Sequence, residues 1–260
     1  MYNYRMSHIE KQTNKPLYED ILWSRPVRRT GRILLVGGHR DGFSELQKVY
    51  QSFEDAQVSE CRLALPDKLS KLVGSLEGIS LLASNPSGSI ARDALSELVF
   101  LANESDLVSL GPDLSNNSET TLTMQRLIAE TRASVVIPPQ SAEQLLPEAG
   151  EWKDKENLLL FISHKQLYKL ATKFAVNVTI PLNPNPDLVA EIAFAVSKEI
   201  SPSLVVHYDD TLIIAVDGSA SITKAKSNNV GLLGTFWLQN STKQYEALTT
   251  AAFLINNPES

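Results

Sequence analysis

The segment Asn157–His164, NLLLFISH, decides the fold. It places five consecutive apolar residues, Leu158–Ile162, between polar neighbours on both sides. So short an apolar run is typical of a strand that is buried on both faces, and such strands occur mainly in parallel sheets covered by helices. Ser163 is a suitable N-cap for a helix that continues to Lys173. The segment therefore predicts a strand followed directly by a helix.

The same alternation of strand and helix extends in both directions. The other core strands are expected at Ile33–Val36, Asp106–Leu110 and Ser134–Ile137. Further strands are predicted at Val58–Leu65, Leu81–Ala83 and Val176–Pro181, and helices at Phe43–Phe53, Ile90–Leu101, Glu119–Thr131, Pro186–Glu199, Val230–Leu238 and Tyr245–Ile255. Leu204–Val206 and Leu212–Ile214 read as a hairpin across Asp209–Asp210 that adds antiparallel edge strands. The pattern predicts an α/β fold with a central, mainly parallel sheet and helices on both faces.

The chain has 260 residues, a length that one α/β domain often reaches. Residues 1–30 lack a clear period, and we interpret them as an N-terminal arm that packs on the domain 31–260 or on a second subunit, so a homo-oligomer is one alternative. Cys61 is the single cysteine and lies in an alternating, strand-like segment, which predicts a buried thiol rather than a nucleophile.

Composition limits the partners. The net charge is −6, which argues against a broad nucleic-acid surface. The one basic run, Arg25–Arg32, fits a solvated linker or a small phosphate-binding patch. There is no apolar run near 18 residues and no signal peptide, so we expect a cytoplasmic protein without a membrane partner.

Ligands of open α/β sheets bind outside the carboxyl ends of the strands, so the loops that follow strands carry the candidate sites. In the loop VGGHRDGF (36–43), Gly37 lets a ligand approach the backbone or simply makes a tight turn. In GPDLSNNSET (111–120), Gly111 can likewise let a ligand approach the backbone, while Asn117 or Ser118 can cap the next helix.

Two further loops complete the set. His164 can hydrogen-bond a ligand, or it can be an ordinary residue at a helix start. The loop KAKSNNVG (224–231) enters an apolar helix, whose N-terminus suits an anion, although Asn228 or Asn229 can also cap it. The chain contains no motif for metal ligands or for a catalytic triad, so we expect no metal bound by protein side chains alone.

Taken in order, these loops resemble the signature of the ADP- or ATP-dependent NAD(P)H-hydrate dehydratases, whose fold is ribokinase-like. Gly37-Gly38-His39 resembles the family's GGS loop, and Gly111–Ser115 resembles its GPGLG loop. His164 matches the histidine of a TPHPGE strand end, and Lys226–Val230 aligns with the GTGD loop. The later KGxxT hairpin is matched by His207–Thr211 in its threonine alone.

This similarity spans about residues 31–255. The segments KPLYEDILWSRP (15–26), NPSGSIARDAL (85–95) and GPDLSNNSET also resemble a group of dehydratase-like proteins from small-genome bacteria.

The resemblance implies an activity and a set of roles. In the family, ATP or ADP with Mg²⁺ drives dehydration of hydrated NADH or NADPH, so NAD(P)H hydrate and an adenine nucleotide are the implied partners. Gly37, Gly111 and His164 would bind the hydrated dinucleotide. Ser227, Asn228 and Asn229 would lie at the nucleotide phosphates, and Asn229 would occupy the position of the catalytic aspartate.

The chain differs from the family at the positions on which the family's catalysis depends. Asn229 cannot accept a proton as a carboxylate does, and Asn228 replaces a glycine that lets backbone N–H groups close on phosphate. The hairpin lysine is His207, and the family's acidic DADAL segment falls on Val136–Gln140, which has no acid.

Three hypotheses therefore stay open. The chain is a divergent hydrate dehydratase, a non-catalytic protein that binds a nucleotide or dinucleotide, or, by analogy of fold alone, a small-molecule kinase. The sequence does not decide whether it is an enzyme.

Overall fold

A computed structural model describes residues 9–13, 15–23, 31–39, 43–74, 77–112, 114–179 and 182–257. Most of the basic run (25–30), the end of the first loop (40–42) and position 113 of the second loop lie outside these described residues.

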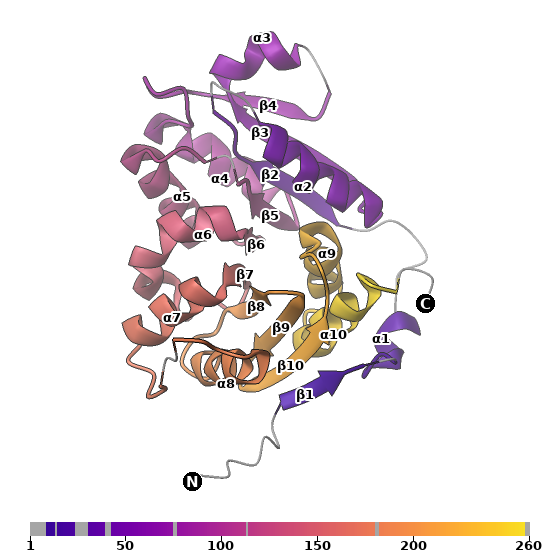
Figure 1. Cartoon of the computed structure of the whole chain (residues 1–260). Coiled ribbons are helices and arrows are strands. Elements are labelled where there is room, and N and C mark those ends of the chain that lie inside the picture. The colour runs from indigo at the N-terminus through magenta and orange to yellow at the C-terminus, as the bar shows by residue number, and fades with distance from the viewer. Residues whose placement is uncertain are drawn as a thin grey trace.

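Ten strands of the described residues form one sheet in the order β1-β10-β9-β8-β7-β6-β5-β2-β3-β4 (Figure 1). Their bounds are β1 Ile9–Gln12, β2 Arg32–Val36, β3 Glu60–Pro66, β4 Ile79–Leu82, β5 Leu107–Leu110, β6 Ser134–Ile137, β7 Leu158–Ser163, β8 Ser203–Tyr208, β9 Thr211–Val216 and β10 Ser219–Lys224. Neighbouring strands from β4 to β8 pair in parallel, and β9 is antiparallel to both β8 and β10. The four expected core strands are confirmed as β7, β6, β5 and β2, which stand side by side.

Helices cover both faces of the sheet, as predicted. One face carries α4 (Leu95–Asn103), α5 (Ser118–Glu130), α6 (Pro139–Leu145), α7 (His164–Lys173) and α8 (Pro186–Val196). The other carries α1 (Glu19–Trp23), α2 (Ser44–Asp55), α3 (Ser70–Val73), α9 (Val230–Gln239) and α10 (Gln244–Leu254). Short 3₁₀ turns lie at Asp67–Leu69, Arg92–Ala94 and Leu146–Trp152. Alternate residues of each core strand enter alternate layers of core, which explains why the interiors of these strands are apolar apart from the buried Ser109 of β5.

Two expectations about the strands were wrong. The described part of the expected strand Val176–Pro181 forms no strand, because Ala175 turns left-handed (φ 52°) and the N–H of Val176 donates back to Ala171 to close α7. The hairpin β8–β9 is not at the edge of the sheet, because β10 and then β1 pair beyond it. Neither β10 nor β1 was predicted from the sequence, because both contain too many polar residues to show a hydrophobic pattern.

The beginning of the described chain packs onto the end of the sheet. β1 pairs in parallel with β10, and the buried Gln12 side chain donates to Thr223 Oγ1 (3.2 Å) and to the Thr249 carbonyl (2.9 Å). Ile21 of α1 is buried in the same core layer as α10.

The thiol of Cys61 on β3 is half-buried rather than buried. Burial raises its pKa to about 12, so it stays protonated at neutral pH and is a poor nucleophile, as the sequence predicted. Among the described residues, no helix is both long and apolar enough to cross a membrane.

The first turn of α9 lies directly on the backbone of α2. A Cβ added to Gly231 would lie 2.1 Å from the carbonyl carbon and oxygen of Ser52, so only glycine permits this contact. The N–H of Gly231 donates to Ser52 Oγ (3.1 Å). The contact fixes the distance between the two helices at the carboxyl edge of the sheet.

We predict that Gly231→Ala destabilises the protein by about 3 kcal/mol, because the clash is with backbone that cannot rotate away. Gly150→Ala is the matched control, since a Cβ there meets nothing within 4 Å. Urea denaturation of both variants measures the difference. Equal stability of the two variants would contradict the close packing of α9 on α2.

Candidate functional site

The carboxyl edge of the sheet brings two of the predicted glycines into contact. Gly37 follows β2, Gly111 follows the neighbouring β5, and a Cβ on Gly37 would lie 3.1 Å from Gly111 Cα. The N–H of Gly111 donates to the Val36 carbonyl (2.6 Å), and a Cβ on Gly111 would collide with Leu46 of α2 at 2.6 Å. Close packing within the protein therefore explains why both positions are glycine.

Beside these glycines lies a cavity of about 370 Å³. It is formed by α2, by the ends of β5 and β6, and by the loop that leads into α9. Its lining residues are Glu45, Lys48, Val49, Ser52, Pro112, Pro138, Pro139, Gln140, Ser227, Asn228, Asn229 and Val230. We call this the central cavity. Its walls are largely neutral, because the two charged residues among those named, Glu45 and Lys48, form an ion pair with each other.

Asn229 caps α9 at the wall of the central cavity. Its Oδ1 accepts a hydrogen bond from the N–H of Leu232 (2.9 Å), while Ser52 accepts from Gly231. Capping was one reading of this loop, and the structure assigns it to Asn229. An aspartate caps a helix as well as an asparagine does, so capping alone does not explain why this position is an asparagine.

His164 lies apart from the residues that line the central cavity. It begins α7, and its ring contacts the rings of Tyr208 (centroids 5.0 Å apart) and Tyr168 (5.7 Å) edge-on. Burial lowers the pKa of His164, and Lys165 lowers it further, while Asp209 opposes both. The imidazole is therefore neutral at pH 7.

The structure thus divides the predicted site residues. Gly37 and Gly111 touch each other, and Ser227–Asn229 line the central cavity together with Pro112, the neighbour of Gly111. His164 occupies the same edge of the sheet, at the end of β7, but it faces two tyrosines.

Sequence reasoning missed several parts of this edge. From α2 the cavity is lined by Glu45, Lys48, Val49 and Ser52, and no motif marks these positions of an ordinary amphipathic helix. Pro138 and Pro139 follow β6 directly, and nothing in the sequence marks them as a wall of the cavity. His207, which the sequence analysis did single out, has a buried Nε2 atom without a hydrogen-bond partner in the described structure.

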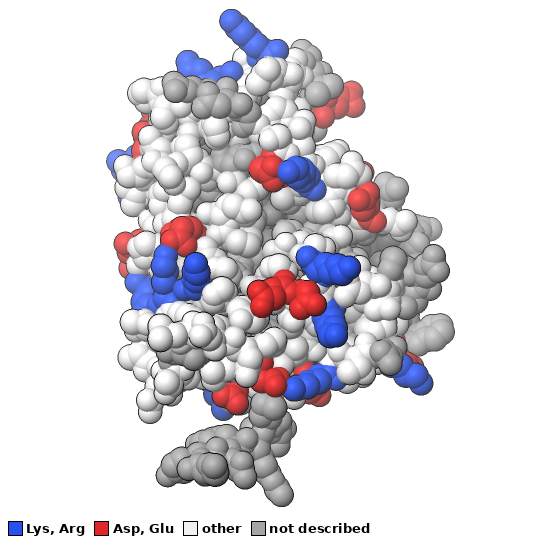
Figure 2. Space-filling model, viewed as in Figure 1, with Lys and Arg blue, Asp and Glu red and all other residues white. Residues whose placement is uncertain are grey.

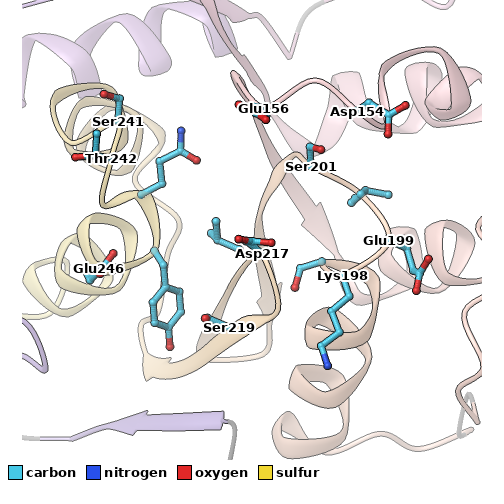
Figure 3. A pocket seen from close by; sticks show the side chains of 15 residues that line it. Asp154, Glu156, Lys198, Glu199, Ser201, Asp217, Ser219, Ser241, Thr242 and Glu246 are labelled. Atoms are coloured by element: carbon cyan, nitrogen blue, oxygen red, sulfur yellow. The ribbon is translucent and has the colours of Figure 1, made fainter.

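A larger hollow of about 690 Å³ lies at the opposite, amino-terminal edge (Figure 3). Carboxylates and hydroxyls line it, and Asp217 projects into it from the β9–β10 turn. No group of three or more His, Cys, Asp or Glu side chains in the described residues could hold a metal ion. We place the candidate site in the smaller central cavity, because sheets of this kind bind ligands at the carboxyl ends of their strands.

Charges are scattered over the face seen in Figure 2, where acidic and basic side chains alternate in small groups. No broad basic patch covers the described part of that face, so an anionic ligand would depend on local backbone N–H groups rather than on a long-range positive field.

No model of a protein family matches the chain, and no curated protein matches its sequence. Solved structures do match. A ribokinase-like superfamily protein from Enterococcus faecalis V583 superposes with a TM-score of 0.68 at 12% identity, covering 98% of this chain and 88% of that one. The fold is ribokinase-like.

Two other solved structures with this fold also match the chain. An ADP/ATP-dependent NAD(P)H-hydrate dehydratase from Bacillus subtilis, co-crystallised with ATP/Mg²⁺, gives a TM-score of 0.60 at 12% identity, covering 95% of this chain and 89% of that one. A pyridoxal kinase from Staphylococcus aureus, in complex with AMP-PCP and pyridoxal, gives 0.51 at 13% identity, with 87% of each chain covered. At such identities the likeness is one of fold.

The lowered pKa of His164 predicts a pH dependence of stability. Because the folded state resists protonation of this ring, the unfolded state binds more protons below its ordinary pKa of about 6.5. The contribution of His164 is therefore present above that pH and is lost as the pH falls. We expect His164→Gln to reduce the loss of unfolding free energy between pH 7.5 and 5, measured by urea denaturation. An unchanged pH profile would contradict the assigned environment of the ring.

Proposed function

We propose that this chain is a ribokinase-like protein that binds an adenine nucleotide in the central cavity and has lost efficient catalysis. The observation that carries the proposal is Asn229. It stands at the first turn of α9 where a general base is expected by resemblance, and its carboxamide caps the helix. Glu45, a carboxylate in the lining, is already paired with Lys48.

Three features support a nucleotide as the ligand. The central cavity lies at the carboxyl edge of the sheet, where folds of this architecture bind ligands. The N-terminus of α9 opens beside it, and the positive end of the helix dipole there favours phosphate, while the N–H groups of Gly231 and Leu232 are bonded to Ser52 and Asn229. The structural neighbours include a protein co-crystallised with ATP/Mg²⁺ and another in complex with AMP-PCP.

The residues present do not fit a Mg²⁺ ion held by the protein. Mg²⁺ prefers carboxylates and phosphate oxygens, and the described lining of the central cavity offers one carboxylate that is already paired. Any Mg²⁺ would reach the site on the phosphates of the nucleotide.

Loss of the base limits what a bound nucleotide can do. A general base contributes about 10²–10⁴ in rate, and a carboxamide cannot take its place. The glycine that lets backbone close on phosphate is also replaced, by Asn228. We expect nucleotide to bind and to turn over slowly or not at all.

A divergent NAD(P)H-hydrate dehydratase is the second candidate. The neutral imidazole of His164 at the carboxyl edge favours it, because such a ring can still hydrogen-bond a polar ligand. NAD(P)H hydrate would then be the second ligand, beside Gly37 and Gly111. A small-molecule kinase is the weakest alternative, since its support is the shared fold with the pyridoxal kinase.

We predict that wild-type protein binds ADP or ATP with Mg²⁺ in isothermal titration calorimetry, yet shows little ATP- or ADP-dependent recovery of NADH absorbance from NADH hydrate. The paired change Asn229→Asp with Asn228→Gly should raise this dehydration at least tenfold. The new carboxylate supplies a base, and the glycine lets backbone N–H groups approach phosphate.

Asn185→Asp is the matched control. Asn185 caps α8 through the same 2.9 Å bond, from the N–H of Leu188, but lies outside the lining of the central cavity. It should leave turnover unchanged. Strong wild-type turnover would reject the loss of catalysis in favour of the dehydratase, whereas wild-type protein that binds neither nucleotide nor NADH hydrate would reject both.

A further inference from the structure

The loop after β4 is folded around one buried side chain, Asn85. Its Oδ1 accepts hydrogen bonds from the N–H and Oγ of Ser87 (3.1 and 2.6 Å) and from the N–H of Ser89 (3.1 Å). The Asn85 carbonyl accepts from the N–H of Gly88 (2.9 Å), which closes a turn with the glycine at φ +83°. The segment NPSGS is therefore a compact turn, which we call the Asn85 turn (residues 85–89).

The Asn85 turn is bonded to the neighbouring β5–α5 loop. The amide of Asn85 donates to Thr120 Oγ1 (3.2 Å) at the start of α5, and both groups are buried. Ser89 Oγ donates to Ser115 Oγ, and the amide of Asn117 donates to Ser87 Oγ (3.2 Å). Since Asn117 also caps α5 through the N–H groups of Glu119 and Thr120, the turn and the helix start form one network.

The other side of the β5–α5 loop is held by α6. Ser141 Oγ donates to the Gly111 carbonyl, and Gln144 Nε2 donates to the Leu114 carbonyl (3.0 Å). The loop is thus fixed from two directions at the carboxyl edge. It carries Pro112, which lines the central cavity, and Gly111, which touches Gly37.

We propose that Asn85 is a positioning residue of the ligand site. It does not line the central cavity, but it holds the β5–α5 loop in the conformation that forms one wall of that cavity. A loop fixed before binding spares the ligand the entropy of ordering it, which favours affinity.

Hydrogen bonding explains why the position needs asparagine. The carboxamide accepts three hydrogen bonds within its own turn and donates one to α5, so the same side chain needs both an acceptor and a donor. A satisfied buried network of this kind specifies one arrangement of two loops, a function that an apolar side chain of the same size cannot perform.

The ligand part of this inference rests on the proposed nucleotide site, so the test has two independent readouts. The first is hydrogen exchange of the backbone amides in residues 111–117, measured by mass spectrometry on the ligand-free protein. The second is the Kd for ADP with Mg²⁺, measured well below the unfolding temperature. Asn85→Ala should speed exchange in that segment and raise the Kd about tenfold.

Ser89→Ala is a milder second variant, because it removes the bond to Ser115 but keeps the turn. It should shift both readouts in the same direction by less. Ser221→Ala is the control: it removes one buried hydroxyl hydrogen bond, to Thr249 on the α10 side of the sheet, and should change neither readout.

Unchanged exchange of residues 111–117 in both Asn85→Ala and Ser89→Ala would overturn the positioning role. Faster exchange with an unchanged Kd would overturn its contribution to binding. If the wild type binds no ADP, the proposed nucleotide site fails, and the exchange experiment alone then decides whether Asn85 holds the loop.

Discussion

The strands at the centre of this protein bury apolar side chains on both of their faces, and this requirement shapes the rest of the molecule. β7 buries Leu158–Ile162 completely, with alternate side chains entering opposite core layers. Each such side chain stabilises the fold by about 2 kcal/mol provided that it is covered. Helices must therefore lie on both faces, and parallel strands then need a crossover helix between one strand and the next. The loops that leave the strands consequently gather at the carboxyl edge.

The structure of that edge is set by a few backbone contacts and polar networks. Gly231 brings α9 against α2, and Gly111 lies against Gly37, so the central cavity is bounded by elements that cannot shift independently. Helix caps such as Asn117 and Asn229 satisfy the first N–H groups of α5 and α9. A site built in this way has a defined shape without any strong charge.

Much of the fold could be predicted from the sequence, because buried parallel strands and amphipathic helices each have a recognisable pattern of apolar residues. The runs at Ile33–Val36 and Leu158–Ile162 form β2 and β7 of one sheet, with β5 and β6 between them, and Ser163 caps α7 within a capping box. β10 and β1 were not predicted, because they contain many polar residues and lack the apolar pattern of a buried strand. The segment Val176–Thr179 was wrongly predicted as a strand. The N–H of Val176 bonds to the Ala171 carbonyl at the end of α7 instead of pairing with a strand.

The candidate site was less predictable, because its walls come from distant segments. Motif order grouped His164 with Asn229, yet only the folded chain shows that His164 faces Tyr168 and Tyr208. Ser52 lines the cavity because α2 packs on α9, and no local sequence pattern predicts that packing. Asn85 begins a sequence, NPSG, that is typical of a turn, but its bond to Thr120 spans 35 positions of sequence.

The proposed nucleotide site can be located by a crystal structure of the wild-type protein grown with ADP and Mg²⁺. We expect density for the nucleotide in the central cavity, with its phosphates at the first turn of α9 beside Ser227–Asn229. Nucleotide in the hollow at the opposite edge, around Asp217, or a central cavity that stays empty at saturating ADP would contradict it.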